Sequence, residues 1–210
     1  MNVVSRCKVY SLDQFTRPYQ YTCEVNGKKC SRIHIVQETL RGNEKTMAIV
    51  NKVQKHCEGN GLIFNVSSMP WVQESNQDGE DPILYPEFQQ TNLSMLQFDS
   101  FIQFMSQLCT DPVTALSRCQ PQNSETSTAK PLAWILIDNL SHLSMDPKFD
   151  PKLLSKSIRL IQQTFGSVVI SASLPLSFHG GIESSFKHQS TKCASGDSLL
   201  SHFNESDIVL

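Results

Sequence analysis

The sequence is short of charge. Aspartate, glutamate, lysine and arginine together make up 18% of its 210 residues, whereas about a quarter is usual for soluble domains. The formal net charge is -2, which excludes a protein that coats nucleic acid through a global basic field. Any contact with nucleic acid must therefore come from a local basic patch or be shared with a partner. The low charge also indicates that a partner covers part of the surface.

Long hydrophobic runs and paired cysteines are absent as well. No stretch of about 18 apolar residues occurs, so we expect no membrane span. The first ten residues lack the apolar core of a signal peptide. The seven cysteines include no Cys-x-x-Cys pair, so we expect no zinc site. We interpret them as reduced thiols of a cytosolic or nuclear protein.

Apolar runs with strand character alternate with segments of helical periodicity. This order predicts an α/β domain with a mostly parallel sheet flanked by helices. The run 132–137 is apolar throughout and predicts a central strand buried on both faces. The other expected strands cover 7–10, 33–36, 62–66, 168–170 and 208–210. The expected helices cover 45–58, 93–108, 112–119 and 151–165.

The helix expected over 151–165 has the clearest boundaries. Asp150-Pro151 combines an N-cap with proline at the first helical position, and Gly166 ends the helix. Residues 11–30 show no clear pattern. We expect a single core domain over 1–210, with exposed excursions near 73–92 and 120–131 and a flexible loop near 174–206.

A strand, a polar loop and a helix over 33–58 follow the order in which a phosphate-binding loop would occur. Such a loop needs two glycines, whose N–H groups wrap the phosphates, and a Lys-Thr or Lys-Ser pair. Lys45-Thr46 stands at the expected helix start, but Thr39 and Glu44 occupy the glycine positions. A carboxylate about 4 Å from a phosphate charge costs about 1 to 4 kcal/mol. We therefore expect a degenerate P-loop, with an ordinary helix N-terminus as the alternative.

Asp138 directly follows the central strand. In P-loop NTPases an aspartate in this place helps to hold magnesium, although here it could instead cap the next turn. Other catalytic patterns are weaker still. Ser171 and Ser173 follow a strand without a Gly-x-Ser-x-Gly elbow, and His34 lies inside an apolar strand, where a hydrogen-bonded core histidine is the simpler interpretation. We expect no catalytic residues, no metal and no cofactor.

Several segments resemble a known family. The most specific are Asp-Pro-Val-Thr-Ala-Leu-Ser-Arg-Cys-Gln at 111–120 and Trp-Ile-Leu-Ile-Asp-Asn-Leu-Ser-His-Leu at 134–143. Lys-Val-Tyr-Ser-Leu at 8–12 and Ser-Leu-Pro-Leu-Ser-Phe-His-Gly-Gly-Ile-Glu at 173–183 occur in matching order. Together they resemble the platinum-sensitivity subunits of the yeast Shu complex, a branch of the RecA-like recombinase paralogues.

This resemblance implies a RecA-like core without ATPase activity, and hence not an enzyme. It implies a heterodimer with a second RecA-like Shu subunit that binds forked or single-stranded DNA. A larger nuclear assembly, which includes a SWIM-type zinc protein, would promote recombinase filament formation. The implied processes are homologous recombination and error-free damage tolerance.

The resemblance also points to a DNA-binding loop after the strand expected over 168–170. The family carries a basic cluster there, of which this chain keeps Lys192, with Lys187 and His188 nearby. We expect these three residues to bind nucleic acid. The degenerate nucleotide site would comprise Lys45, Thr46 and Asp138. Two alternatives remain at this point: a scaffold that contacts protein only, and a degenerate ATPase that still binds nucleotide.

Overall fold

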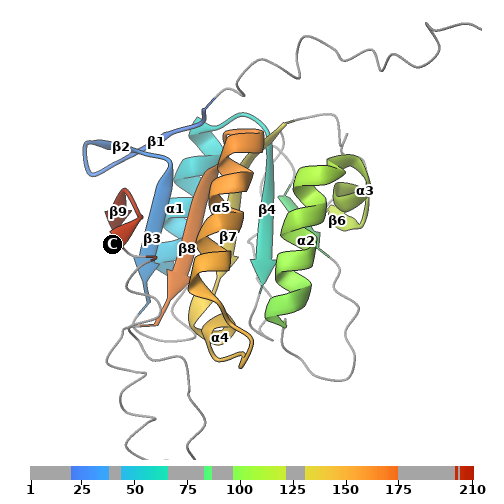
Figure 1. Cartoon of the computed structure of the whole chain (residues 1–210). Helices are drawn as coiled ribbons and strands as arrows, with labels where there is room; N and C mark the ends of the chain where they lie inside the picture. The colour runs from blue at the N-terminus through green and yellow to red at the C-terminus, as the bar shows by residue number, and fades with distance from the viewer. Residues whose placement is uncertain are drawn as a thin grey trace, which may run out of the picture.

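The computed structural model of the chain describes residues 20–37, 44–65, 83–86, 97–121, 131–174, 202 and 204–210. Its centre is a seven-stranded sheet with the order β6-β5-β4-β7-β8-β3-β9 (Figure 1). Neighbouring strands are parallel except β5 and β6. The strands are β3 (Arg32–Val36), β4 (Asn60–Asn65), β5 (Ile83–Pro86), β6 (Cys119–Pro121), β7 (Leu132–Asp138), β8 (Val168–Ser173) and β9 (Ile208–Val209).

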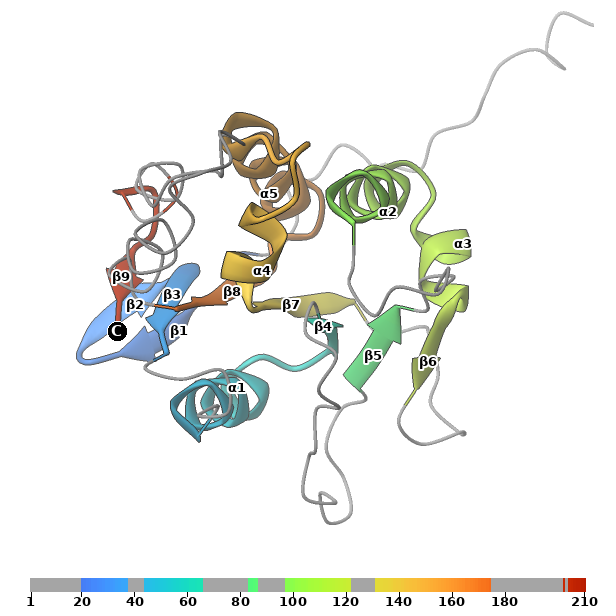
Figure 2. The same ribbon diagram turned by 90° about the horizontal axis from the view of Figure 1, so that it is seen from below.

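Helices cover both faces of this sheet, as Figure 2 shows from below. One face is covered by α1 (Glu44–His56). The other is covered by α2 (Phe98–Thr110), α4 (Leu140–Ser144) and α5 (Pro151–Phe165), while α3 (Pro112–Ser117) lies near β6 at the sheet edge. A mostly parallel sheet with helices on both faces confirms the predicted α/β fold class.

The core consists of two apolar layers separated by the sheet. All seven residues of β7 are buried, as predicted for a strand covered on both faces. Because side chains alternate along a strand, Ile135 and Ile137 join the layer beneath α2 and α5. Trp134 and Leu136 join the layer beneath α1. Asp138 therefore lies at the carboxyl end of a strand that is packed on both faces by apolar layers.

Helix α5 has the boundaries that the sequence predicts. The Asp150 carboxylate accepts hydrogen bonds from the backbone N–H groups of Lys152 and Leu153, at 2.8 and 3.3 Å. Gly166 ends the helix in the left-handed region with φ 68°, a conformation that glycine adopts without a steric penalty. The buried stripe of the helix is fully inaccessible at Leu154, Ile158 and Ile161.

The N-terminal part of the described chain contains a hairpin where the sequence showed no clear pattern. Strands β1 (Cys23–Val25) and β2 (Lys28–Cys30) pair antiparallel. Asn26 and Gly27 join them with φ values of 52° and 76°. Positive φ at both central residues is the geometry for which an Asn-Gly pair is favoured, so the signal was present in the sequence.

Other boundaries differ from the predictions. Strand β5 lies inside the segment expected as the first exposed excursion, over 73–92. Strand β6 begins at Cys119, where a helix was expected to end, and overlaps the first two residues of the second excursion, expected over 120–131. Helix α2 begins at Phe98 rather than at residue 93, because the Asp146 carboxylate accepts the Phe98 N–H at 2.8 Å. Strand β8 continues through Ser173 rather than ending at Ile170. The strand expected over 7–10 lies outside the described residues.

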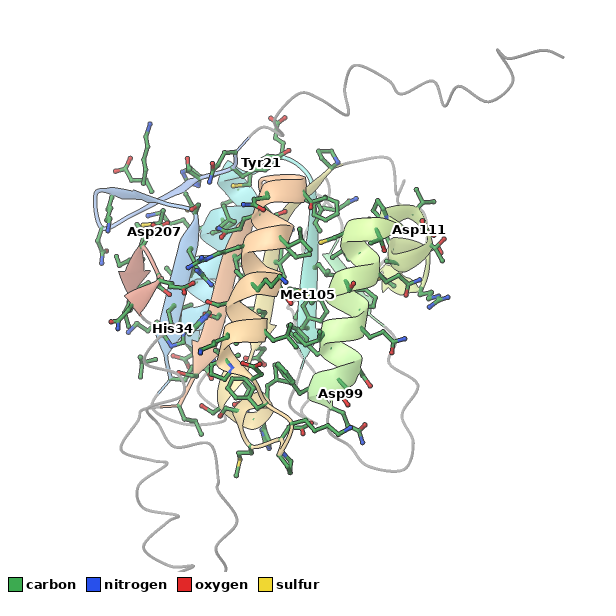
Figure 3. All side chains as sticks on the ribbon, viewed as in Figure 1. Tyr21, His34, Asp99, Met105, Asp111 and Asp207 are labelled. Carbon is green, nitrogen blue, oxygen red and sulfur yellow. The ribbon has the colours of Figure 1, made fainter. Side chains whose placement is uncertain are left out.

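The end of the segment expected as a flexible loop, together with Asp207 directly after it, packs against β3 and α5 (Figure 3). Asp207 accepts hydrogen bonds from the N–H groups of Ser31 and Arg32, at 2.6 and 2.8 Å. Glu205 forms ion pairs with Arg32 at 2.7 Å and with Arg159 at 3.0 Å. These contacts hold β9 beside β3. Residues 175–201 lie outside the described part of the chain.

Candidate functional site at the carboxyl edge of the sheet

Two strand ends and a helix start meet at the carboxyl edge of the sheet. Gln37 directly follows β3, Thr46 lies in the first turn of α1, and Asp138 ends β7. The Gln37 Nε2 donates a hydrogen bond to the Thr46 hydroxyl at 2.8 Å. The same side-chain amide also hydrogen-bonds to the Asp138 carboxylate. Gln37 therefore links two of the three residues predicted for the nucleotide site.

The Asp138 carboxyl group is strongly shielded from water. The residue is 8% exposed, and burial raises its pKa from 3.8 to about 6. The hydrogen bonds from Gln37 and from the Asn139 N–H favour the carboxylate and act in the opposite direction. Because desolvation outweighs them, the charge of Asp138 lowers the stability of this edge at neutral pH.

The third predicted residue lies outside this hydrogen-bond network. Lys45 is exposed, as is Glu44, the first residue of α1. Thr46 is fully buried. The structure therefore brings Thr46 and Asp138 together through Gln37 but leaves Lys45 on the surface. Thr39 lies outside the described residues.

Sequence reasoning missed Gln37. The available signal was its place: it directly follows a buried strand, as Asp138 does. Polar residues that follow parallel strands of one sheet gather at the same edge, and only β8 separates β3 from β7. What the sequence could not show is that the side chain of Gln37, which is 6% exposed, turns inward.

A second polar cluster lies inside the sheet around His34. The His34 Nδ1 and Nε2 hydrogen-bond to the hydroxyl groups of Ser171 and Ser173, at 2.8 and 2.9 Å. The His202 Nε2 lies 2.9 Å from the same Ser171 hydroxyl. Burial lowers the pKa of His34 to about 3 and that of His202 to about 4. His34 is thus the hydrogen-bonded core histidine that the sequence predicted.

The residues predicted to bind DNA, Lys187, His188 and Lys192, lie outside the described residues and stay a prediction. The described structure stops at Leu174, directly after β8, and His202, on the far side of this gap, contacts β8. The Leu174 N–H donates to the Ser141 hydroxyl at 2.9 Å, and His202 bonds to Ser171. These contacts hold the two flanks of 175–201 beside the sheet.

Other features of the described residues do not form a second site of this kind. A cavity of about 340 Å³ beside α4 is lined by Asp99, His142 and Lys148, among others, and by none of the Gln37 network. Within the described ranges, no group of three His, Cys, Asp or Glu side chains could hold a metal ion. No helix of those ranges is long and apolar enough to cross a membrane. Five cysteines there carry thiols rather than disulfides: Cys23, Cys30, Cys57, Cys109 and Cys119.

Comparison with known proteins agrees with the resemblance of the short segments. The family model described as "Shu complex component Psy3, DNA-binding description" matches residues 7–210. Platinum sensitivity protein 3 of Saccharomyces cerevisiae is 27% identical over 202 residues, which cover 87% of this chain and 78% of that relative. The match spans both strand ends that carry the Gln37 network. The chain therefore belongs to the Psy3 family of Shu complex components.

Proposed function

We propose that this chain is a non-catalytic, DNA-binding subunit of a nuclear Shu complex. The observation that carries the non-catalytic part is the position of Gln37 between Thr46 and Asp138. The chain would pair with a second RecA-like subunit and join further subunits, including a SWIM-type zinc protein. The assembly would bind forked or single-stranded DNA and promote recombinase filament formation during homologous recombination and error-free damage tolerance.

The contacts of Gln37 argue against nucleotide chemistry. In P-loop NTPases, magnesium is held by a hydroxyl of the P-loop and by the aspartate that follows the central strand. Here the Gln37 amide hydrogen-bonds to both the Thr46 hydroxyl and the Asp138 carboxylate. Glu44 adds a negative charge at the start of α1, where a triphosphate would need backbone N–H groups. These features support a degenerate site that has become structural.

Membership of a family described as DNA-binding supports the second part of the proposal. The chain has a net charge of -2, so its DNA contacts must be local. Lys187, His188 and Lys192 are the contacts proposed from the resemblance. Because lysine contacts to phosphate release counterions, they should appear in the salt dependence of binding.

The test uses the full chain together with the Shu subunits that co-purify with it. Binding to labelled fork DNA is measured by fluorescence anisotropy over a series of salt concentrations. Lys187→Ala/Lys192→Ala should weaken binding and reduce the logarithmic salt slope by about 1.8, while the subunits still co-purify. If this variant bound fork DNA like the parent at every salt concentration, these lysines would not be the DNA site. A parent complex that failed to bind DNA would favour the protein-only scaffold.

A further inference from the structure

Helix α5 carries the most one-sided charge of any helix in the described part of the chain. Its 15 residues, Pro-Lys-Leu-Leu-Ser-Lys-Ser-Ile-Arg-Leu-Ile-Gln-Gln-Thr-Phe, include three basic residues and no acidic one. The spacing of Lys152, Lys156, Arg159 and Gln163 is four, three and four residues, which places them on one face of a helix. All four are exposed. At about 1.5 Å per residue they form a stripe about 16 Å long.

This stripe is displayed on a rigid support. The opposite side of α5 is buried in the core through Leu154, Ile158 and Ile161. Figures 1 and 2 place α5 on the outside of its layer, with no other described element over its outer face. A ligand on the stripe would therefore meet charges whose backbone positions are already ordered.

Two of the basic residues are available for a ligand. Lys152 and Lys156 form no ion pair within the described part of the chain. Arg159 does, because its guanidinium lies 3.0 Å from Glu205. Glu205 also pairs with the buried Arg32, so its charge is shared between two arginines. The stripe keeps a net positive charge in a chain whose total is negative.

The stripe begins near the point where the predicted DNA-binding segment leaves the described structure. Helix α5 begins after α4, at the carboxyl ends of β7 and β8 (Figure 1). The segment 175–201 leaves from the end of β8, after Leu174. The first turns of α5 and the base of that segment therefore share one edge of the sheet.

We propose that the outer face of α5 is a binding surface for the DNA backbone, with Lys152 and Lys156 contacting phosphates and Gln163 extending the stripe. This proposal rests on the proposed DNA-binding function and adds a surface to it. Phosphate contacts from lysine position a protein on DNA without reading the sequence. Leu153 and Leu160, which are 38% and 44% exposed beside the stripe, make a protein partner the competing occupant.

The experiment measures anisotropy of labelled single-stranded DNA with the co-purified complex between about 50 and 200 mM salt. Lys152→Ala/Lys156→Ala should reduce the logarithmic salt slope by about 1.4, since each phosphate contact of a single strand contributes about 0.7. The affinity deficit of this variant should then shrink about sevenfold across that salt range. Lys152→Arg/Lys156→Arg, which keeps the charge, should retain the parent slope.

The matched control is Lys52→Ala/Lys55→Ala. It removes the same charge from exposed positions of α1, on the other face of the sheet (Figure 2). An equal loss of slope in this control would overturn the proposal, because net charge rather than the stripe would then be responsible.

Three other results would also overturn the proposal. In the first, the parent complex binds DNA, but the salt slope of Lys152→Ala/Lys156→Ala equals that of the parent. The proposed function would then stand, and the α5 surface would not be part of the DNA site. In the second, Leu153→Ser/Leu160→Ser no longer co-purifies with the other subunits, while the lysine variant binds DNA like the parent. The outer face of α5 would then be a surface for a protein partner. The third is a parent complex that does not bind DNA, which removes the proposed function as well.

Discussion

Replacing Asp138 with asparagine should stabilise the protein at neutral pH. Asp138 is 8% exposed, and its charge is held in a site where burial raises its pKa to about 6. Asparagine has nearly the same shape and keeps an oxygen that can accept the hydrogen bonds from Gln37 and the Asn139 N–H. The substitution removes the charge while keeping most of these contacts.

The magnitude follows from the pKa shift. The folded protein holds the proton up to about pH 6, whereas the unfolded chain releases it near 3.8. The folded state therefore binds more protons between these values, and the free energy of unfolding of the parent falls as the pH rises through this window. A shift of about two pKa units corresponds to about 3 kcal/mol at about 1.36 kcal/mol per unit. The asparagine side chain does not titrate, so the variant lacks this loss.

The assay is urea unfolding of parent and Asp138→Asn at a series of pH values from about 4 to 7.5. The difference in unfolding free energy should shift in favour of the variant by up to about 3 kcal/mol across this range. The buried histidines titrate in both proteins, so their contributions cancel in the difference. A difference that stays constant with pH, or that shifts in favour of the parent, would refute the account of Asp138 as a desolvated structural carboxylate.

Three further substitutions test the packing and the polar clusters. Gln37→Leu should raise the pKa of Asp138 further and lower the free energy of unfolding at pH 7 by about 1 to 3 kcal/mol, because hydrogen bonds to a buried charge are lost; parent-like stability would contradict the bridging role. His202→Gln should reduce the fall in the free energy of unfolding as the pH drops from about 6.5 to 4. The reason is that a histidine whose pKa is lowered in the folded state is protonated first in the unfolded chain. An unchanged pH profile in urea unfolding would argue against this. Gly61→Ala should lower the melting temperature strongly, because its Cβ would lie 2.0 Å from the Trp134 ring; unchanged thermal unfolding would mean that the ring can move aside freely.

Local chemistry allowed much of the fold to be predicted. The start and end of α5 follow from Asp150-Pro151 and Gly166, since both act on backbone groups next to them in the chain. The apolar run 132–137 identified the central strand because burial on both faces leaves no polar positions. These features depend on residues close in sequence, so a single sequence contains them.

The features that were missed depend on distant partners. Ser171 and Ser173 belong to β8 because His34 and His202 supply hydrogen bonds that make buried serines tolerable. Strands β5 and β6 are short and contain Pro86 and Pro121. They pair with each other across a long separation in sequence, and β6 forms the edge of the sheet. Judged by composition alone, such segments look like loops.

The candidate site was predicted in part for the same reason. Thr46 and Asp138 were singled out from known patterns of nucleotide binding, and the structure links them. The linking residue, Gln37, matches no pattern, and its role exists only once β3 and β7 are placed in one sheet. Lys45 was chosen for its place beside Thr46, but adjacent residues on a helix point in different directions, and Lys45 is exposed.

The central claim is that the Gln37 network is structural and that the chain acts through DNA rather than nucleotide. The most direct measurement is isothermal titration of the co-purified complex with magnesium and ATP, followed by fork DNA in the same sample. The account predicts no ATP binding in the micromolar range, and the same DNA affinity with and without ATP. A micromolar ATP isotherm that is lost in Lys45→Ala, together with ATP-dependent DNA affinity, would contradict it.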